Sequence, residues 1–205
     1  MKKAFLVIIL VSTTLLFFGC QKNTTIETNP GTWTTVSTFD HSDFTGAVQA
    51  VLLSLKNEDF LTLSTFVWPQ GLRFSPYEYV NSWTDVVLDT ELVANAPILS
   101  RSFTWWSYDG SGEPIDLSIG QYFEKFVNDA DYANAPEVFY NQSSQRGNTI
   151  NNIAQVYANK QWGEFYFSGF DAQYEGIDRK SLTLVFDQVD GRWYLIGIVH
   201  GAWTI

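Results

Sequence analysis

The stretch of sequence that decides the fold is residues 181–199, SLTLVFDQVDGRWYLIGIV. Apolar residues alternate along its first half, which places them on one face of a β-strand. These residues are Leu182, Leu184 and Phe186. Asp190 and Gly191 then form a turn signal of the kind that joins two antiparallel strands. The second half is strongly apolar again, and we expect it to pair back onto the first. The sequence therefore predicts an antiparallel hairpin at the end of the domain.

The start of the domain is predicted to be helical. Apolar residues recur at offsets 0, 4, 7, 8 and 11, which is one face of an α-helix, and they are Phe44, Val48, Val51, Leu52 and Leu55. Ser42 or Asp43 can cap this helix, because a side-chain oxygen there accepts a hydrogen bond from a free backbone N–H group. A second, shorter helix is predicted from Asn57, and Pro69 ends it.

The middle of the domain mixes both kinds of element. Residues 101–108 read as a strand, residues 109–112 as a turn, and residues 114–117 as a returning strand. Ser118 and Gln121 form a capping box, which predicts the start of a helix. Two further elements are expected, a short helix at 149–157 and a strand at 162–170. Helices first, a mixed middle and a closing hairpin describe one α+β domain over residues 42–205.

Two segments carry a resemblance to a known fold family. Residues 55–63, LKNEDFLTL, follow the opening helix, and residues 184–198, LVFDQVDGRWYLIGI, form the closing hairpin. Both resemble the nuclear-transport-factor-2-like (cystatin-like) domains. The resemblance covers only these two ends of the domain, and it implies N-terminal helices packed on a curved antiparallel sheet around a cone-shaped pocket. The polar and aromatic middle is longer than the family minimum, so it is either an insertion or a sign of another α+β fold.

The first residues read as an export signal. A basic start, Met1-Lys2-Lys3, precedes an uncharged apolar run at 4–18, which is too short to span a bilayer. Residues 16–20, LFFGC, resemble the lipobox of bacterial lipoproteins, with Phe17 where that family prefers Leu. The resemblance implies a signal peptide at 1–19, cleavage before Cys20, diacylglycerol on its sulfur and a fatty acid such as palmitate on the new amino end. The alternative is a plain signal peptide with an incidental cysteine.

The expected location follows from this signal. Residues 20–41 are rich in Thr and Asn and show no periodicity, so we expect a flexible tether between the lipid and the domain. The membrane partner is then reached through the lipid on Cys20, in the bacterial cell envelope. Gln21 follows the cysteine, which in that family favours the outer membrane in a Gram-negative host. In a Gram-positive host the anchor would lie on the outer face of the cell membrane.

Composition excludes several classes of function. The chain has 205 residues, a net charge of −10 and a single cysteine. An acidic chain of this kind is a poor partner for nucleic acid, which attracts cationic surfaces. Residues 109–116 place oxygen ligands at alternate positions, but they do not match a calcium-binding EF-hand, and we expect a plain turn. No phosphate-binding or dinucleotide motif occurs, so neither a metal nor a cofactor is predicted.

Aromatic and polar residues in the middle of the chain are the candidates for a ligand pocket. They combine flat apolar faces with polar tips, which suits a pocket or a protein interface. The pocket candidates are Arg73, Tyr77, Tyr79, Trp105, Tyr108, Asp109 and His200, and Trp106 shares their character. The alternative is that aromatic residues pack the core of a sheet domain.

The residues do not decide between binding and catalysis. His200 follows a strong apolar strand and could act as a general acid or base, or be a hydrogen-bonded structural histidine. No nucleophile motif accompanies it. The leading hypothesis is therefore a non-catalytic binding or accessory domain for a small apolar or glycan-like ligand or another envelope protein. The alternatives are a pocket enzyme, isomerase-like, dehydratase-like or hydrolase, using His200 or Asp109, and a purely structural domain.

Overall fold

A central six-stranded sheet organises the part of the chain that the computed structural model describes, which is residues 40–142, 146 and 149–204. The expectations for the signal peptide, for Cys20 and for nearly all of the tether lie outside these residues. His41, at the end of the expected tether, stacks on Phe66 with ring centroids 4.1 Å apart. The packed part of the domain therefore includes His41, which precedes the first helix.

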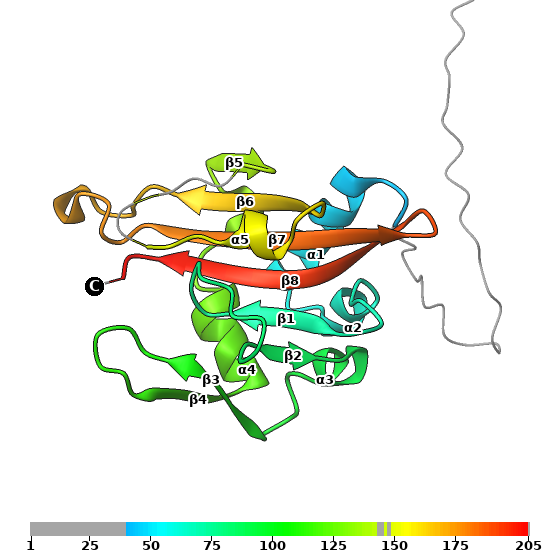
Figure 1. The fold of residues 1–205 in the computed structure, drawn as a ribbon, viewed down its shortest axis with the longest axis horizontal. Coiled ribbons are helices and arrows are strands. Elements are labelled where there is room, and N and C mark those ends of the chain that lie inside the picture. The colour runs from blue at the N-terminus through cyan, green and yellow to red at the C-terminus, as the bar shows by residue number, and fades with distance from the viewer. Residues whose placement is uncertain (1–39, 143–145, 147–148, 205) are drawn as a thin grey trace, which may run out of the picture. The chain divides into compact units, whose positions relative to one another are not determined.

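The sheet has the strand order β2-β1-β8-β7-β6-β5 (Figure 1). Its strands are β1 (Leu72–Ser75), β2 (Val86–Leu88), β5 (Glu137–Tyr140), β6 (Gln161–Phe167), β7 (Lys180–Val189) and β8 (Arg192–Ala202). Neighbours are antiparallel except for β1 and β8, which run parallel. The domain is therefore α+β with a mixed sheet, and the expectation of a purely antiparallel sheet is corrected at this pair. Only strands joined by a hairpin must be antiparallel, and β1 is far from β8 in the sequence.

The predicted closing hairpin is confirmed. Val189 pairs with Arg192, and the two residues between them, Asp190 and Gly191, have φ angles of 50° and 76°. Positive φ at both positions is the mark of a type I′ turn, which suits the twist of paired strands. The hairpin forms two adjacent strands in the interior of the sheet, so many of its residues are buried.

The opening helices are also confirmed, with one shift. α1 spans Phe44–Lys56, and the Asp43 side chain accepts a hydrogen bond of 2.6 Å from the backbone N–H of Gly46. α2 spans Phe60–Ser64 and is capped by Asp59, so it starts later than predicted from Asn57. Asn57 instead ends α1, and Glu58 has a φ of 53°, which no helix allows.

The middle of the chain forms a separate hairpin and several short helices. β3 (Ser102–Ser107) and β4 (Pro114–Ser118) pair only with each other, and they lie beside the six-stranded sheet (Figure 1). The predicted capping box of Ser118 and Gln121 is present at the start of the helix that follows β4. The helical elements are α3 (Thr90–Ala94), α4 (Ile119–Tyr122), the π-helical turn η1 (Phe123–Val127), α5 (Ile153–Val156) and the 3₁₀ turns η2 (Tyr132–Asn134) and η3 (Ala172–Tyr174).

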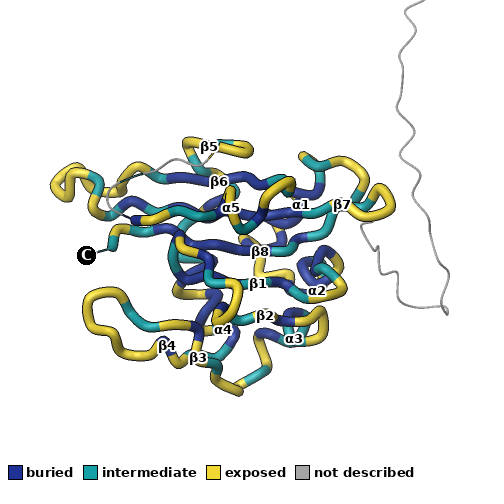
Figure 2. The backbone as a smooth tube through the Cα atoms, viewed as in Figure 1, coloured by how far each residue is buried: buried dark blue, intermediate teal, exposed yellow. Residues whose placement is uncertain are grey.

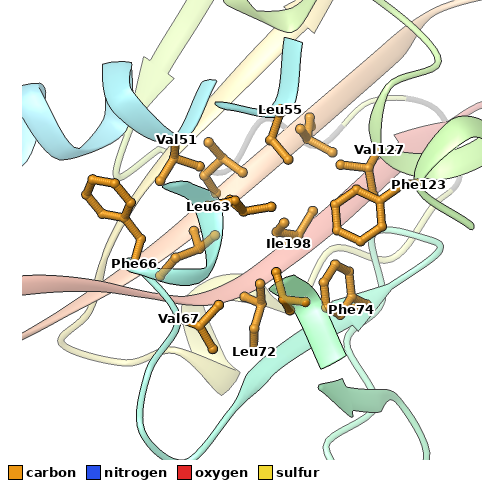
Figure 3. Packing of buried hydrophobic residues seen from close by; sticks show 14 of the residues in the cluster. Val51, Leu55, Leu63, Phe66, Val67, Leu72, Phe74, Phe123, Val127 and Ile198 are labelled. Carbon is orange, nitrogen blue, oxygen red and sulfur yellow. The ribbon is translucent and has the colours of Figure 1, made fainter. Parts of the chain in front are cut away.

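The main core lies between the helices and one face of the sheet. Figure 3 shows side chains from α1, α2, β1, η1 and β8 pointing towards one another. Leu182, Leu184 and Phe186, the residues whose alternation predicted a strand, belong to this core and are fully buried. Phe74 contacts Tyr122 and Phe123 edge to face, so large aromatic side chains fill much of the interior.

A smaller core covers the opposite face of the sheet. It contains residues from α5, from the segment between β1 and β2, and from the strands, namely Val80, Ile153, Tyr157, Trp162, Val185 and Val199. Because both faces are covered, the middle of β7 and of β8 is dark blue in Figure 2. Val80, in the segment between β1 and β2, belongs to this smaller core. The segment is therefore packed on the sheet, and this packing positions the site described next.

Candidate functional site

A groove of about 600 Å³ opens between the β1–β2 segment and the β3–β4 hairpin. Three separate stretches of the chain line it, with a contribution from Thr204, which follows β8. The lining residues are Pro76, Tyr77, Tyr79, Asp85, Trp106, Ser107, Tyr108, Asp109, Gly110, Ser111, Gly112, Thr149, Ile150 and Thr204. We call it the aromatic groove, because four of its lining residues are Tyr or Trp.

Hydrogen bonds hold the β1–β2 side of the aromatic groove in place. Asn152 donates to the carbonyl of Val80 at 2.9 Å and accepts from its N–H at 2.8 Å. The carboxylate of Asp85 accepts from the Ser75 hydroxyl at 2.5 Å and from the backbone N–H of Asn81 at 2.8 Å. These contacts satisfy backbone hydrogen-bonding groups in a segment without regular secondary structure. The backbone that carries the exposed side chains of this segment is therefore held in place.

The β3–β4 hairpin supplies the other side, and its register shifts between Thr104 and Ser107 so that β3 has one extra residue there. Trp105 is fully buried, donates from its indole N–H to the carbonyl of Leu117 at 3.0 Å and stacks on Tyr122 with ring centroids 3.7 Å apart. Trp106, the next residue, lines the groove and is 39% exposed. The predicted turn is present, with positive φ at Gly110.

A direct bond ties the two sides together. The backbone N–H of Asp109 donates to the Tyr77 hydroxyl at 2.9 Å. Burial raises the pKa of Tyr77, so this hydroxyl stays neutral at ordinary pH. On the rim, the Lys125 ammonium donates to the Tyr108 hydroxyl at 2.9 Å and lies 4.3 Å from the centre of its ring. One face of Tyr108 is thus already occupied, whereas Tyr79 is 52% exposed.

Two carboxylates, those of Asp85 and Asp109, line the aromatic groove, and the basic side chains of Arg73 and Lys125 lie behind it and beside it. Burial raises the pKa of Asp85, against the hydrogen bonds from Ser75 and Asn81 and the charge of Arg73. Arg73 does not line the groove, but its guanidinium approaches the Asp85 carbonyl at 3.4 Å. Arg73 therefore supports the wall behind the groove, while Lys125 stands at its rim.

His200 also lies outside the aromatic groove. It is buried, with Nδ1 at 3.0 Å from the carbonyl of Pro76 and Nε2 at 3.2 Å from a carboxylate oxygen of Asp129. Both ring nitrogens therefore lie against polar groups of the protein. Neither nitrogen is left to serve as a general acid or base.

Asp129 is the centre of this second cluster. It accepts a hydrogen bond from the Tyr132 hydroxyl at 2.8 Å and forms an ion pair with Lys180 at 2.8 Å. Burial by itself raises the pKa of Asp129, but the bonds from His200, Lys180 and Tyr132 outweigh it and lower the pKa to about 2. We call His200, Asp129, Lys180 and Tyr132 the His200 network, and its geometry is that of a structural link.

The structure thus brings four of the predicted pocket residues together and separates three. Tyr77, Tyr79, Tyr108 and Asp109 line the aromatic groove. Trp105 lies in the core, Arg73 behind the groove wall and His200 in its own network. Sequence reasoning missed Asp85 altogether, because no local pattern indicates that the Ser75 hydroxyl, ten residues away on β1, and the backbone of Asn81 will both bind its carboxylate.

Two further features lie apart from these residues. A cavity of about 320 Å³ sits at the end of α1, near the exposed ion pair of Lys56 and Asp131, and no predicted site residue lines it. On the face of the sheet covered by α5, Glu78 and Glu164 lie buried with Arg146 and Arg179. Burial and the charge of Glu164 raise the pKa of Glu78 to about 7, against the pull of the two arginines.

Comparison with known proteins adds no relative. No family model matches the chain, and no curated protein matches it in sequence. Within residues 40–142, 146 and 149–204, no helix has the length and apolar character needed to cross a membrane, and no three metal-ligating side chains gather in one place. Any statement about function therefore depends on the site itself.

Proposed function

We propose that this protein is a lipid-anchored component of the bacterial cell envelope whose domain binds a ligand in the aromatic groove and catalyses no reaction. The observation that carries the proposal is the convergence of Tyr77, Tyr79, Trp106 and Tyr108 from two separate segments onto one groove. Concave sites lined by aromatic side chains with a few polar groups are the usual form of a ligand pocket.

The state of the polar side chains favours binding over catalysis. His200, the strongest candidate for proton transfer, has both ring nitrogens at structural partners. Asp85 holds Ser75 and the backbone of Asn81, and Tyr77 accepts from the backbone of Asp109. A general base needs a free position within hydrogen-bond reach of its substrate. The pocket-enzyme alternative is left with Asp109, which lines the groove.

We further propose that the domain is nuclear-transport-factor-2-like. The order of elements supports this, with two helices before β1, the closing hairpin in the sheet and β1 beside β8. Under this proposal the β3–β4 hairpin, which pairs with no strand of the large sheet, is the insertion that lengthens the middle of the chain. The aromatic groove would then be built by the insertion, outside the pocket that the family resemblance implies.

A labelling experiment tests the anchor. Cells that express the protein and are fed labelled palmitate should yield labelled protein in the membrane fraction, and Cys20→Ser should lose both the label and the membrane association. Phe17→Leu, which restores the residue that lipoboxes prefer, is the matched control and should keep both. An unlabelled wild-type protein would contradict the lipid anchor.

A ligand screen tests the aromatic groove. The full chain, purified in detergent, is exposed to a chemically diverse fragment library and observed by saturation-transfer NMR. We expect hits that Trp106→Ala loses and that Trp83→Ala keeps. Trp83 is 96% exposed and lies outside the groove lining, so it controls for the loss of a surface indole. A screen in which every hit survives Trp106→Ala would contradict the proposed site.

A further inference from the structure

We infer that the ligand of the aromatic groove is an uncharged, hydroxyl-rich ring compound, namely a neutral saccharide. This inference rests on the proposed binding function and narrows it to one chemical class. Three properties of the groove point to it, namely its open aromatic faces, its many hydroxyl groups and its balance of charge.

The open aromatic faces suit a ring with an apolar side. Tyr79 is 52% exposed and Trp106 is 39% exposed, and they reach the groove from opposite walls. Tyr77 and Tyr108 are already engaged, by Asp109 and by Lys125. A saccharide ring presents C–H groups on its faces and hydroxyl groups on its rim, so it can lie against an aromatic face while its rim remains hydrogen-bonded.

The polar part of the lining suits the rim of such a ring. Ser107, Ser111, Thr149 and Thr204 bring hydroxyl groups that both donate and accept, and Asp109 brings a carboxylate. Thr149 and Thr204 lie 3.0 Å apart and can share a ligand hydroxyl between them. A purely apolar ligand would remove water from these groups without replacing its hydrogen bonds, which disfavours that class.

The charge balance favours a neutral ligand over a cation or an anion. Asp85 and Asp109 are the acidic lining residues, and no described Lys or Arg lines the groove. Against the larger effect of burial, the charge of Arg73 lowers the pKa of Asp85 from behind the wall, and the charges of Asp109 and Lys125 shift the pKa of Tyr77 in opposite directions. Asp85 therefore has a countercharge already, which weakens its attraction for a cation. The net charge of −10 on the chain disfavours anions.

The volume is compatible with this class. Small-molecule sites in proteins usually measure about 300–1,000 Å³. The aromatic groove, at about 600 Å³, lies within that range and is open at the surface between two walls. An open groove allows a chain of rings to continue beyond its ends, so short oligosaccharides are the appropriate probes.

Isothermal titration with neutral trisaccharides tests the inference. The full chain is purified in a polyoxyethylene detergent, because glucoside detergents would compete. The probes are trimers of glucose, xylose and N-acetylglucosamine, with a glucosamine trimer as the cation and a galacturonic acid trimer as the anion. We expect at least one neutral trimer to bind, Trp106→Ala and Tyr79→Ala each to weaken it about tenfold or more, and Trp83→Ala to leave it unchanged.

The outcomes separate this inference from the proposed function. If fragments of other classes bind at Trp106 and no neutral trimer does, the saccharide assignment is wrong and the binding function stands. If neither the library nor the trimers depend on Trp106, both are wrong. Tighter binding of a charged trimer than of every neutral one would overturn the charge argument, and saccharide binding that survives Trp106→Ala would overturn the assignment to this groove.

Discussion

The aromatic groove and the His200 network meet at Pro76, yet they differ in whether their side chains remain exposed to a ligand. Pro76 lines the groove, and its carbonyl binds His200. In the network each polar group is matched within the protein, which fixes its geometry. In the groove, Tyr79 and Trp106 keep large exposed faces. A titratable side chain is therefore a weaker sign of function here than an aromatic face left open beside hydroxyl groups.

The largest effect is expected at two adjacent residues, Trp105 in the core and Trp106 in the groove. Trp105→Ala should lower the free energy of unfolding by about 3–5 kcal/mol, because it empties a fully buried space against Tyr122. Trp106→Ala should lower it by about 1 kcal/mol or less and instead weaken ligand binding about tenfold or more. Urea unfolding measures both values. Equal costs for the two variants would mean that Trp106 belongs to the core and that the groove is not open to ligand.

The same pair shows how far the sequence could lead. The sequence pattern predicts a strand that contains Trp105 and Trp106, and the register of β3 shifts between Thr104 and Ser107. The pattern does not say which of the two tryptophan side chains is covered. That depends on Tyr122, which reaches Trp105 from another element. Local signals, by contrast, were sufficient where the partners are neighbours in the chain, as in the turn at Asp190 and the cap at Asp43.

Distant pairings account for the rest of what the sequence left open. The parallel pair of β1 and β8 joins Arg73 to Gly197, and no turn signal connects them. His200 stands at the end of an apolar strand, and its role depends on Asp129, which comes from a polar segment with no periodicity. Chemistry-bearing residues could be nominated from the sequence, but their partners could not.

The second prediction breaks the His200 network. Asp129→Asn keeps the shape of the side chain but leaves Lys180 without its countercharge and removes the carboxylate that lies against buried His200, so unfolding should cost about 3 kcal/mol less. Asp131→Asn removes a carboxylate from an exposed ion pair with Lys56 and should have little effect. Chemical denaturation of both variants provides the comparison. A harmless Asp129→Asn would show that the network is not structural.

The network also has a pH signature. The pKa of Asp129 is about 2 in the folded protein, below the value of 3.8 expected for a free carboxyl. A lowered pKa means that the unfolded state binds the proton more readily, so this stabilisation is complete above about pH 4 and is lost as the pH falls towards 2. Asp129→Asn should remove this acid-sensitive part of the unfolding curve.

The third prediction concerns Glu78, whose backbone neighbours line the aromatic groove while its own side chain is buried on the sheet. Its pKa is about 7, against 4.5 for a free glutamic acid, and its Oε2 has no hydrogen-bond partner among the described residues. The folded state then holds the proton more tightly, so stability should fall by roughly 2 kcal/mol as the pH rises from 4.5 to 7. Glu78→Gln should flatten this dependence.

Thermal unfolding between pH 4 and 8 measures this slope. Glu124→Gln, which changes an exposed glutamate, is the control and should follow the wild-type curve. The carboxyl of Glu78 faces Glu164, Arg146 and Arg179, and the two arginines favour its charged form. A wild-type stability that rises over this pH range would show that the arginines dominate and that Glu78 is ionised in its buried position.

The smallest effect is expected at Lys125, which lies beside the aromatic groove and contacts its lining residue Tyr108. Lys125→Gln removes the ammonium from the face of Tyr108, and at an exposed site such a contact is worth about 0.5 kcal/mol. Because the ammonium also offsets the acidic lining, the variant should bind the glucosamine trimer more tightly and leave the affinity for the neutral trimer nearly unchanged. A neutral trimer that binds ten times more weakly would mean that Lys125 itself contacts the ligand. A charged side chain would then take part in recognising the ligand. The aromatic groove and the His200 network could no longer be distinguished as an open aromatic surface and a satisfied polar network.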